Sequence, residues 1–325
     1  MPTAVFPQNY TVNLPWVESP FFKKELKSAN LDPETEKMVT QFAEEGYVVF
    51  DPEIDFSVLD EVIASLEEKH LATSNLRIQD AWAYAEAVRQ IAIAPKVMDL
   101  LRVLYRREPI PFQTLNFKLG TQQRTHSDSI HFHSIPQRFM CGVWVALEDV
   151  RDDNGPLHYY PGSQKLPFYD LVDMGLKGTT AQTIEEVYGK TYIKYEDFLE
   201  DMIQAQGLKK SILNMKKGQA IIWSANLLHG GEKIKTPGAT RYSQVTHYFF
   251  EDCVYYTPLR SDATLDKLFI RQIMNIATRK VVENKYMDQT LNQAHEGYPL
   301  RFTVPKTLLS LSRLIPAPVK KILKR

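Results

Sequence analysis

The feature that most constrains the fold is a series of short apolar runs, beginning near Phe112, that are typical of β-strands. Sequences rich in Gly, Pro, Asn and Asp separate these runs and favour tight chain reversals. Many short strands joined by such turns are typical of an antiparallel sandwich or a jelly roll. The chain is therefore predicted to be mainly β with flanking helices. The predicted strands cover residues 113–118, 139–147, 157–160, 220–223 and 241–250.

Helical patterns precede these strands. Asp32 can cap a helix that starts at Pro33, and Gly46 can end it before a short apolar strand at 47–50. Further helices are expected at 57–70 and, as two segments, between residues 79 and 105. We expect one domain over residues 1–325. Its predicted parts are an N-terminal helical support at 1–111, a β core at 112–252 with an insertion at 165–213, a C-terminal helical segment at 253–300 and a tail at 301–325.

Composition excludes several function classes. Lys plus Arg and Asp plus Glu both number 39, so a formal net charge of zero gives no reason to expect nucleic-acid binding. The first ten residues lack the pattern of a signal peptide, and no run approaches the roughly 18 apolar residues of a membrane span. Cys141 and Cys253 lack a CxxC spacing and are predicted to be buried free thiols. These features together favour a reducing, cytoplasmic setting.

His126 and Asp128 form the strongest candidate for a metal site. Residues two apart in a strand face the same side, so both side chains can point into one cavity. His229, which follows the predicted strand at 220–223 and precedes a turn, is the best candidate for a third ligand. Two histidines and one carboxylate on one face of an octahedron leave open positions for a 2-oxo acid and O₂. A structural zinc site would instead be closed by four protein ligands.

Arg241 is the candidate anchor for such a 2-oxo acid. It lies twelve positions after His229, at the start of the next predicted strand. If the two strands pair antiparallel, its side chain can project into the same cavity. A guanidinium can bind a carboxylate through two parallel charge-assisted hydrogen bonds, which lysine cannot match.

Several motifs occur in a fixed order along the chain: His126-Ser127-Asp128, Trp144 to Asp149, Asn154-Gly155-Pro156-Leu157, Pro161 to Lys165, Lys217 to Ala220, His229 and Arg241. With these motifs, the chain resembles the phytanoyl-CoA dioxygenase family of iron(II)- and 2-oxoglutarate-dependent oxygenases, over roughly residues 112–252. The resemblance implies a double-stranded β-helix, which is a jelly roll of the cupin type. It also implies a hydroxylase, or a related enzyme, that acts on a C–H bond of a small organic substrate.

The resemblance also implies roles for individual residues. His126, Asp128 and His229 would bind Fe(II), and Arg241 would bind the distal carboxylate of 2-oxoglutarate. Lys118 and Trp144 match positions that commonly line the co-substrate pocket in the family. Gln164 departs from the family, which usually has histidine there, but it falls in a turn outside the ligand set. Asp128 favours hydroxylation over halogenation, because halogenating relatives replace this carboxylate with a small residue.

Other histidines leave alternatives open. One of His131 and His133 is expected to touch substrate, while the other packs or is solvated. A cupin-type site using both would need a nearby glutamate, and none follows at the expected distance. His158 and His247, on predicted strands, are interpreted as hydrogen-bonded barrel residues. The insertion at 165–213, with a helix expected at 195–206, is either a mobile lid or a fixed cover.

The tail at 301–325 combines basic and apolar residues and contains no acidic residue. Such a segment can pack on its own domain or on a second subunit, as in a homo-oligomer. It can also lie on an anionic membrane surface or on an acidic partner. Two rival functions stay open at this stage. The same site could desaturate, epoxidise or close a ring, or the chain could be a catalytically inactive binding or scaffold protein.

Overall fold

A computed structural model describes residues 12–72, 77–176, 184–262, 268–287 and 289–291. Its largest element is a six-stranded sheet in which every neighbouring pair is antiparallel. All five strands predicted from the sequence between residues 113 and 250 are present, four of them in this sheet, together with the short strand at 47–50. In spatial order the sheet contains β1 (Tyr47–Phe50), β8 (Ala220–Ser224), β5 (Met140–Ala146), β10 (Ser243–Phe250), β3 (Pro109–Phe117) and β2 (Arg77–Gln79).

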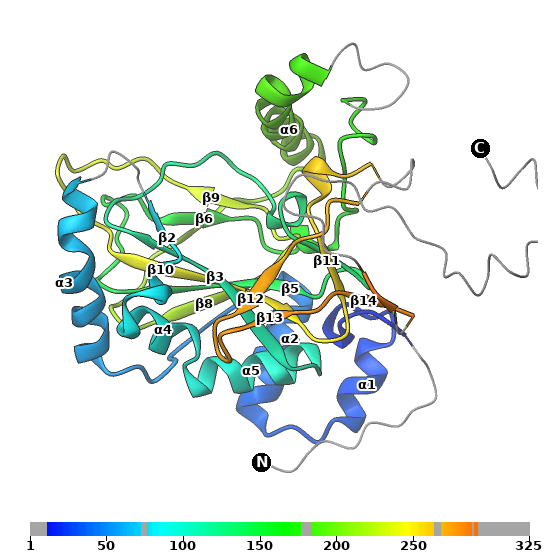
Figure 1. Ribbon diagram of the computed structural model, residues 1–325, viewed down its shortest axis with the longest axis horizontal. Helices are drawn as coiled ribbons and strands as arrows, with labels where there is room; N and C mark the ends of the chain where they lie inside the picture. The colour runs from blue at the N-terminus through cyan, green and yellow to red at the C-terminus, as the bar shows by residue number, and fades with distance from the viewer. Residues whose placement is uncertain (1–11, 73–76, 177–183, 263–267, 288, 292–325) are drawn as a thin grey trace, which may run out of the picture.

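A second, three-stranded sheet faces the first (Figure 1). It consists of β7 (Ser211–Leu213), β6 (Leu157–Tyr159) and β9 (His229–Gly231), all antiparallel. One apolar cluster takes side chains from both sheets, including Trp144 and Tyr159. Two antiparallel sheets that share a core form the predicted jelly roll. The predicted insertion ends earlier than expected, because β7 belongs to this sheet.

Helices cover the outer face of the larger sheet. The N-terminal cap works as predicted: the Asp32 carboxylate accepts from the backbone N–H groups of Glu34 and Thr35, and Gly46 ends the helix at a φ of 82°. The helices are α1 (Phe22–Ser28), α2 (Pro33–Glu45), α3 (Phe56–Ala72), α4 (Glu86–Ala92) and α5 (Pro95–Tyr105).

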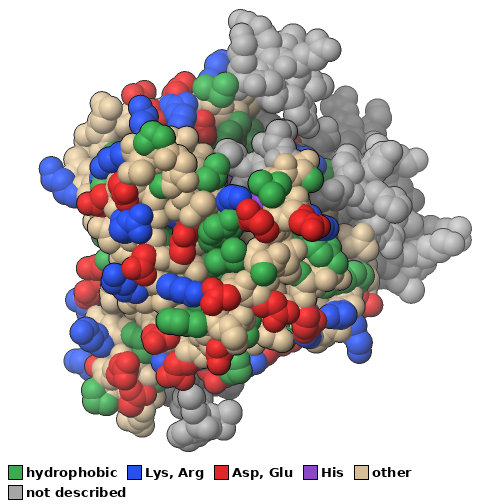
Figure 2. Space-filling view, turned by 90° about the vertical axis from the view of Figure 1, so that its left-hand side faces the viewer, with side chains coloured by type: hydrophobic (Ala, Val, Ile, Leu, Met, Phe, Trp, Pro, Cys, Tyr) green, Lys and Arg blue, Asp and Glu red, His purple; other side chains and the backbone are tan. Residues whose placement is uncertain are grey.

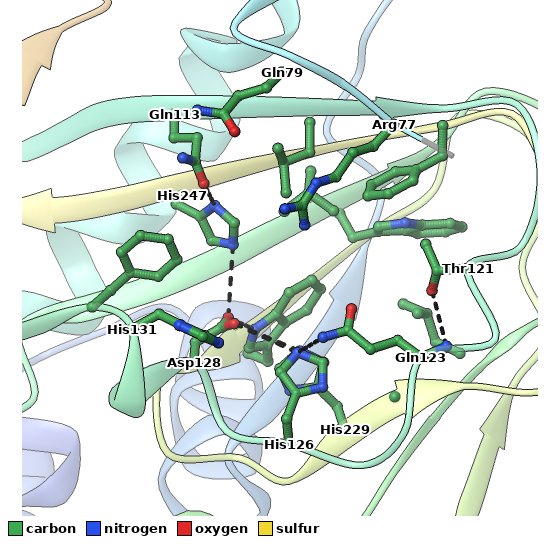
Figure 3. A pocket seen from close by; sticks show the side chains of 18 of the residues that line it. Arg77, Gln79, Gln113, Thr121, Gln123, His126, Asp128, His131, His229 and His247 are labelled. Atoms are coloured by element: carbon green, nitrogen blue, oxygen red, sulfur yellow. Dashed lines mark hydrogen bonds and ion pairs between the residues drawn. The ribbon is translucent and has the colours of Figure 1, made fainter. Parts of the chain in front are cut away.

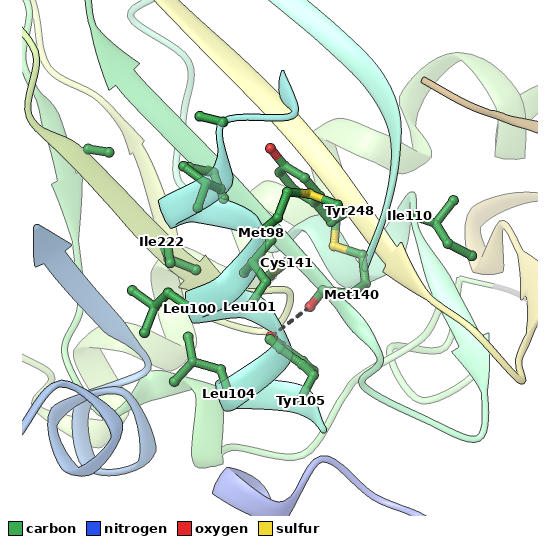
Figure 4. Close-up of a cluster of buried hydrophobic side chains, with 14 of the residues drawn as sticks. Met98, Leu100, Leu101, Leu104, Tyr105, Ile110, Met140, Cys141, Ile222 and Tyr248 are labelled. Atoms are coloured by element: carbon green, nitrogen blue, oxygen red, sulfur yellow. Dashed lines mark hydrogen bonds between the residues drawn. The ribbon is translucent and has the colours of Figure 1, made fainter. Parts of the chain in front are cut away.

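Figure 4 shows apolar side chains of α5 packed against the larger sheet. Hydrogen bonds fix the helices to this sheet, since the Tyr105 hydroxyl donates to the Met140 carbonyl (3.2 Å) and Tyr248 to that of Ala92 (2.8 Å). Cys141 lies in this cluster, and both cysteines are buried and free, as predicted.

The predicted C-terminal helical segment at 253–300 is wrong for the residues that the structure describes there. Ile273 is buried and the next residue is exposed, which is the period of a strand, and the Asn275 side chain accepts from the backbone N–H of Ala277 to make a turn. The tail at 301–325 lies outside the described residues. The strands found instead are β11 (Val254–Tyr256), β12 (Ile273–Asn275), β13 (Lys280–Val282), β14 (Lys285–Tyr286) and β15 (Gln289–Thr290).

The insertion carries α6 (Ile184–Gln206), which begins well before the predicted helix at 195–206. Figure 2 shows acidic and basic side chains interspersed over the face turned to the viewer, in keeping with a formal net charge of zero. Within the described ranges, no helix is both long enough and apolar enough to cross a bilayer.

Gly142 permits a close approach between β5 and β8. A Cβ atom at this position would lie 2.4 Å from the Trp223 indole, so any side chain forces a shift. We expect Gly142→Ala to lower the free energy of unfolding by about 1–3 kcal/mol. This cost exceeds the roughly 0.5–1 kcal/mol that alanine gains over glycine in a strand. Urea-induced unfolding measures the change.

A double-mutant cycle separates this steric cost from other effects of the substitution. In a Trp223→Phe background the smaller ring leaves space, so Gly142→Ala should cost clearly less than in the native chain. Equal costs in the two backgrounds would contradict the steric explanation.

Candidate metal and co-substrate site

The segment that carries His126 and Asp128 is not a regular strand. His126 makes an isolated bridge with His229, whereas Asp128 begins a short 3-10 helix, η3 (Asp128–Ile130). Ser127 is extended, and its hydroxyl accepts from the Ser129 backbone N–H at 3.2 Å, which caps this helix. The strand argument for a shared side was therefore wrong in detail. Ser127, the one residue between the two, is extended and caps the 3-10 helix that begins at Asp128.

Backbone hydrogen bonds hold His126 and His229 next to each other. The N–H of His126 donates to the carbonyl of His229 at 2.9 Å, and the reverse bond measures 3.0 Å. The two imidazole centroids are 4.5 Å apart. The two histidines are therefore neighbours, as expected of ligands to one metal. They meet at the edge of the smaller sheet, where β9 bridges the His126 segment.

His126, Asp128 and His229 form one buried cluster, with candidate ligand atoms within 4.8 Å of one another. Oδ1 of Asp128 lies 3.9 Å from Nε2 of each histidine. Nδ1 of His126 lies 3.0 Å from the Arg124 carbonyl oxygen, and Nδ1 of His229 lies 2.9 Å from that of Leu227. A carbonyl oxygen only accepts, so each Nδ1 carries the proton and each Nε2 carries a lone pair that can bind a metal, although the Gln123 side-chain nitrogen lies 3.3 Å from Nε2 of His126.

The protonation states suit metal binding. Burial lowers the pKa of His126 to about 4 and also lowers that of His229, so both rings are neutral near pH 7. Burial alone would raise the pKa of Asp128, but the surrounding histidines and a hydrogen bond from Trp223 outweigh it and bring the pKa to about 2. Neutral imidazoles and an ionised carboxylate are the forms in which these side chains coordinate metals.

Trp223 fixes the orientation of the carboxylate. Its indole N–H donates to Oδ2 of Asp128 at 2.8 Å, and the ring packs 4.8 Å from His229. With Oδ2 occupied in this way, Oδ1 is the oxygen that faces the two histidines. The residue enters the site because Gly142 leaves space for its ring.

The cluster lies on a cavity of about 430 Å³ (Figure 3). Arg241 and Trp144 line the same cavity, as predicted, with the guanidinium carbon 5.4 Å from the indole centre. Arg241 is 1% exposed, and burial lowers its pKa to about 10, so it stays charged at neutral pH. Nη1 donates to the Gly155 carbonyl at 3.0 Å, while Nε has no hydrogen-bond partner among the described residues. A buried guanidinium with an unpaired donor fits a carboxylate ligand.

Lys118 does not belong to the residues that line this cavity, so its predicted place there is wrong. It follows Phe117 on β3, and successive residues of a strand face opposite sides. Phe117 lines the cavity, whereas the Lys118 ammonium forms an ion pair with Glu67. Gln164 is buried away from the cavity, where its side chain donates to the Ala43 carbonyl.

The remaining histidines divide between the cavity and its surroundings. His131 lines the cavity, while His133 stacks on Phe168 with ring centres 4.6 Å apart. His158 is hydrogen-bonded to Thr125 outside the cavity, as predicted. His247 was underestimated: it lines the cavity, and its Nε2 lies 3.8 Å from Oδ2 of Asp128.

Sequence reasoning missed several further polar side chains of the cavity. Two come from β2, which was not predicted, and two from the segment predicted as helix. Gln113 lies in a predicted strand, but only the register of β10 with β3 places it opposite His247. Its side-chain oxygen then lies 3.1 Å from Nδ1 of His247. These residues are Arg77, Gln79, Gln113, Arg260 and Arg271.

Helix α6 contacts the ligand segment directly. The Tyr195 hydroxyl accepts from the Ser127 backbone N–H at 3.2 Å. Arg124, two residues before His126, forms ion pairs with Asp197 (2.7 Å) and Glu200 (2.8 Å). Helix α6 thus contacts the segment that carries His126 and Asp128 on both sides of His126. Its motion as a lid stays a prediction.

Two facing antiparallel sheets with a His-Asp-His cluster on a shared cavity define a double-stranded β-helix protein with a three-ligand candidate metal site. Residues 42–243 match the family described as Phytanoyl-CoA dioxygenase (PhyH). The chain belongs to this family, as the resemblance predicted.

Among curated relatives, "Phytanoyl-CoA dioxygenase domain-containing protein 1" of Danio rerio is 25% identical over 180 residues, which cover 54% of this chain and 57% of that protein. "Phytanoyl-CoA dioxygenase, peroxisomal" of Rattus norvegicus is 24% identical over 57% of this chain and 48% of that protein. The chain thus spans about half the length of these two relatives.

Solved structures agree on the fold. The epimerase SnoN from nogalamycin biosynthesis is 19% identical with a TM-score of 0.53, covering 83% of this chain and 97% of that one. EctD from S. alaskensis, solved with 2-oxoglutarate and 5-hydroxyectoine, is 17% identical with a TM-score of 0.52, covering 79% and 90%. The jelly-roll prediction is therefore confirmed.

His229→Ala is expected to weaken Co(II) binding by more than about 100-fold, whereas His247→Ala should weaken it by less than about 10-fold. The first change removes a ligand. His247 Nε2 lies 3.8 Å from the Asp128 carboxylate, beyond hydrogen-bond distance, so its loss should cost less than the roughly 10–100-fold that is typical of a hydrogen-bonded outer partner. Isothermal titration calorimetry measures both. Equal losses in the two variants would contradict the assignment of His229 as ligand and His247 as neighbour.

The metal-free protein should lose stability as the pH falls from about 6.5 to about 4. Burial holds the pKa of five histidines at about 4, so in this window the unfolded chain binds protons that the folded chain does not. Urea unfolding at pH 7, 5.5 and 4.5 measures the slope, which His133→Gln should reduce. A free energy of unfolding that does not change over this range would contradict the expectation. The five are His126, His131, His133, His158 and His247.

Proposed function

We propose that this chain is an iron(II)- and 2-oxoglutarate-dependent oxygenase that oxidises a C–H bond of a small organic substrate. The observation that carries the proposal is that one cavity is lined both by the buried His-Asp-His cluster and by the buried Arg241, whose Nε is unpaired among the described residues. Membership of the phytanoyl-CoA dioxygenase family supports it.

In this proposal His126, Asp128 and His229 hold Fe(II) and leave coordination positions open. Arg241, beside Trp144, binds the distal carboxylate of 2-oxoglutarate. When bound, the metal and co-substrate supply the oxidising power of O₂, with succinate and CO₂ as by-products.

The protein's own task is to position these groups and to keep them dry. The two backbone carbonyls that accept from the Nδ1 atoms fix the imidazole rings, and Trp223 fixes the carboxylate. All three candidate ligands are less than 10% exposed, which keeps bulk water away from the reacting groups. Burial of Arg241 strengthens its attraction for an anion, because the surrounding medium screens it less.

The same site could serve desaturation, epoxidation or ring formation, since these outcomes depend on where the substrate lies. Solved proteins with this fold include the epimerase SnoN and the carbocyclase SnoK. A scaffold without activity is the rival from another class. The complete ligand set and Arg241 favour the enzyme, since a scaffold has no need for an unpaired buried cation beside three metal ligands. The cytoplasmic setting and the membrane-surface or partner role of the tail stay predictions.

The decisive assay is formation of succinate from 2-oxoglutarate by the purified chain with Fe(II), ascorbate and O₂, before any substrate is known. Slow, metal-dependent turnover is expected, as is binding of Fe(II) under anaerobic conditions. Absence of both turnover and iron affinity would support the scaffold.

Arg241→Lys should weaken 2-oxoglutarate binding by at least about 10-fold and leave metal affinity within about twofold, because lysine cannot form the paired hydrogen bonds of a guanidinium. The matched control is Lys118→Met, a basic residue outside the cavity, which should leave both affinities at the native level. Calorimetric titration of 2-oxoglutarate into the Co(II)-loaded protein measures the effect. A larger loss in the Lys118 variant would overturn the assignment.

A further inference from the structure

The described lining of the cavity contains more basic than acidic side chains, although the chain as a whole has a formal net charge of zero. Among the described residues that line it, Asp128 is the one carboxylate, whereas four are arginines. The outer face in Figure 2, by contrast, mixes acidic and basic side chains. The proposed function uses only one of these arginines. The other three are Arg77, Arg260 and Arg271.

The charges of the proposed co-substrates do not account for these three. At neutral pH 2-oxoglutarate is a dianion and Asp128 is ionised, and together they exceed the two positive charges of Fe(II) by one negative charge. The guanidinium of Arg241 balances that charge. The proposed metal and co-substrate therefore make no use of Arg77, Arg260 and Arg271, which line the same cavity.

Arg271 is held in place as a binding group would be. Its backbone N–H donates to the Tyr255 carbonyl at 2.8 Å, and its own carbonyl accepts from the Asn284 side chain at 3.0 Å. Nη1 donates to the Thr257 hydroxyl at 2.9 Å, and the guanidinium carbon lies 4.7 Å from the centre of the Phe132 ring. Such fixed geometry reduces the entropy lost when a ligand binds.

The Phe132 ring lies between this arginine and His247, next to the His-Asp-His cluster. It lies 4.9 Å from the His247 ring, whose Nε2 is 3.8 Å from the Asp128 carboxylate. Arg77, Arg271 and His247 all line this cavity.

Arg77 reaches this region from β2. Figure 3 shows its side chain extending into the cavity above the candidate ligands, on the same side as Gln79. The two residues alternate along the strand, which places both side chains toward the cavity. Arg77 is an exposed residue that also lines the cavity, so a solute can reach its side chain.

We infer that the substrate of this cavity carries an anionic group, a carboxylate or a phosphate, whose charge is met by Arg77 and Arg271. The inference rests on the proposed function in taking this cavity as the substrate site. Guanidinium groups bind both anions through paired, charge-assisted hydrogen bonds. Neutral molecules of the same shape should bind poorly.

Three six-carbon probes test the charge requirement: hexanoate, hexyl phosphate and the neutral hexanamide. Their affinities for the full chain are measured by ligand-observed NMR with Zn(II) and saturating 2-oxoglutarate present, so that Arg241 is engaged and no turnover occurs. At least one anion should bind about tenfold or more tightly than hexanamide. The tighter of the two anions identifies the group that is recognised.

Arg77→Gln and Arg271→Gln should each weaken the preferred anion by about fivefold or more and leave hexanamide unchanged. Arg151→Gln removes the same charge from the surface, where the side chain is 60% exposed, and should have no effect. Thermal unfolding checks that each variant is folded. If Arg271→Gln is unstable, Arg77→Gln, at an exposed strand edge, carries the test.

Hexanamide binding as tightly as both anions, or native anion affinity in both variants, would overturn the inference. The titration is repeated without metal and 2-oxoglutarate. If metal and 2-oxoglutarate fail to bind, the proposed function is wrong. The metal-free chain still shows whether anions bind more tightly than hexanamide and whether the two arginine variants weaken them. The two failures are therefore distinguishable.

Discussion

The pair of backbone hydrogen bonds between residues 126 and 229 is the constraint on which the centre of this molecule depends. It joins the edge of the smaller sheet to a segment about a hundred positions earlier in the chain. The two imidazoles are brought together by main-chain geometry, so no side-chain interaction has to hold them against their mutual repulsion when protonated. Asp128 then reaches the same point because Ser127 caps the turn that follows.

Burying a carboxylate among imidazoles is costly unless its charge is balanced. Here the indole N–H of Trp223 satisfies one oxygen, and the other faces two nitrogen lone pairs. That arrangement is repulsive for a bare carboxylate and favourable for a carboxylate that shares a cation with the two rings. The helices behind the larger sheet supply the apolar packing that holds such a site in place.

Much of the fold and of the candidate site could be predicted from the sequence, and each wrong prediction has a physical cause. Turn residues and apolar runs indicated the strands, and the donor types indicated the cluster and Arg241. Lys118 was misplaced because a resemblance does not fix which side of β3 a residue faces. His247 was underestimated because only the register of β10 with β3 aims it at Asp128. The segment at 253–300 was predicted to be helical, although β11 pairs with the distant β4 (His133–Ile135) and β12 pairs with β13 in a local hairpin.

The strand that supplies Arg77 is three residues long and, among the described residues, pairs only with β3. An edge of this kind tolerates substitution at little cost to the sheet, since few main-chain bonds depend on it. His126 and His229 have no such freedom, because their backbones hydrogen-bond to each other. Substitutions on β2 can therefore change the lining of the cavity while the His-Asp-His cluster keeps its geometry.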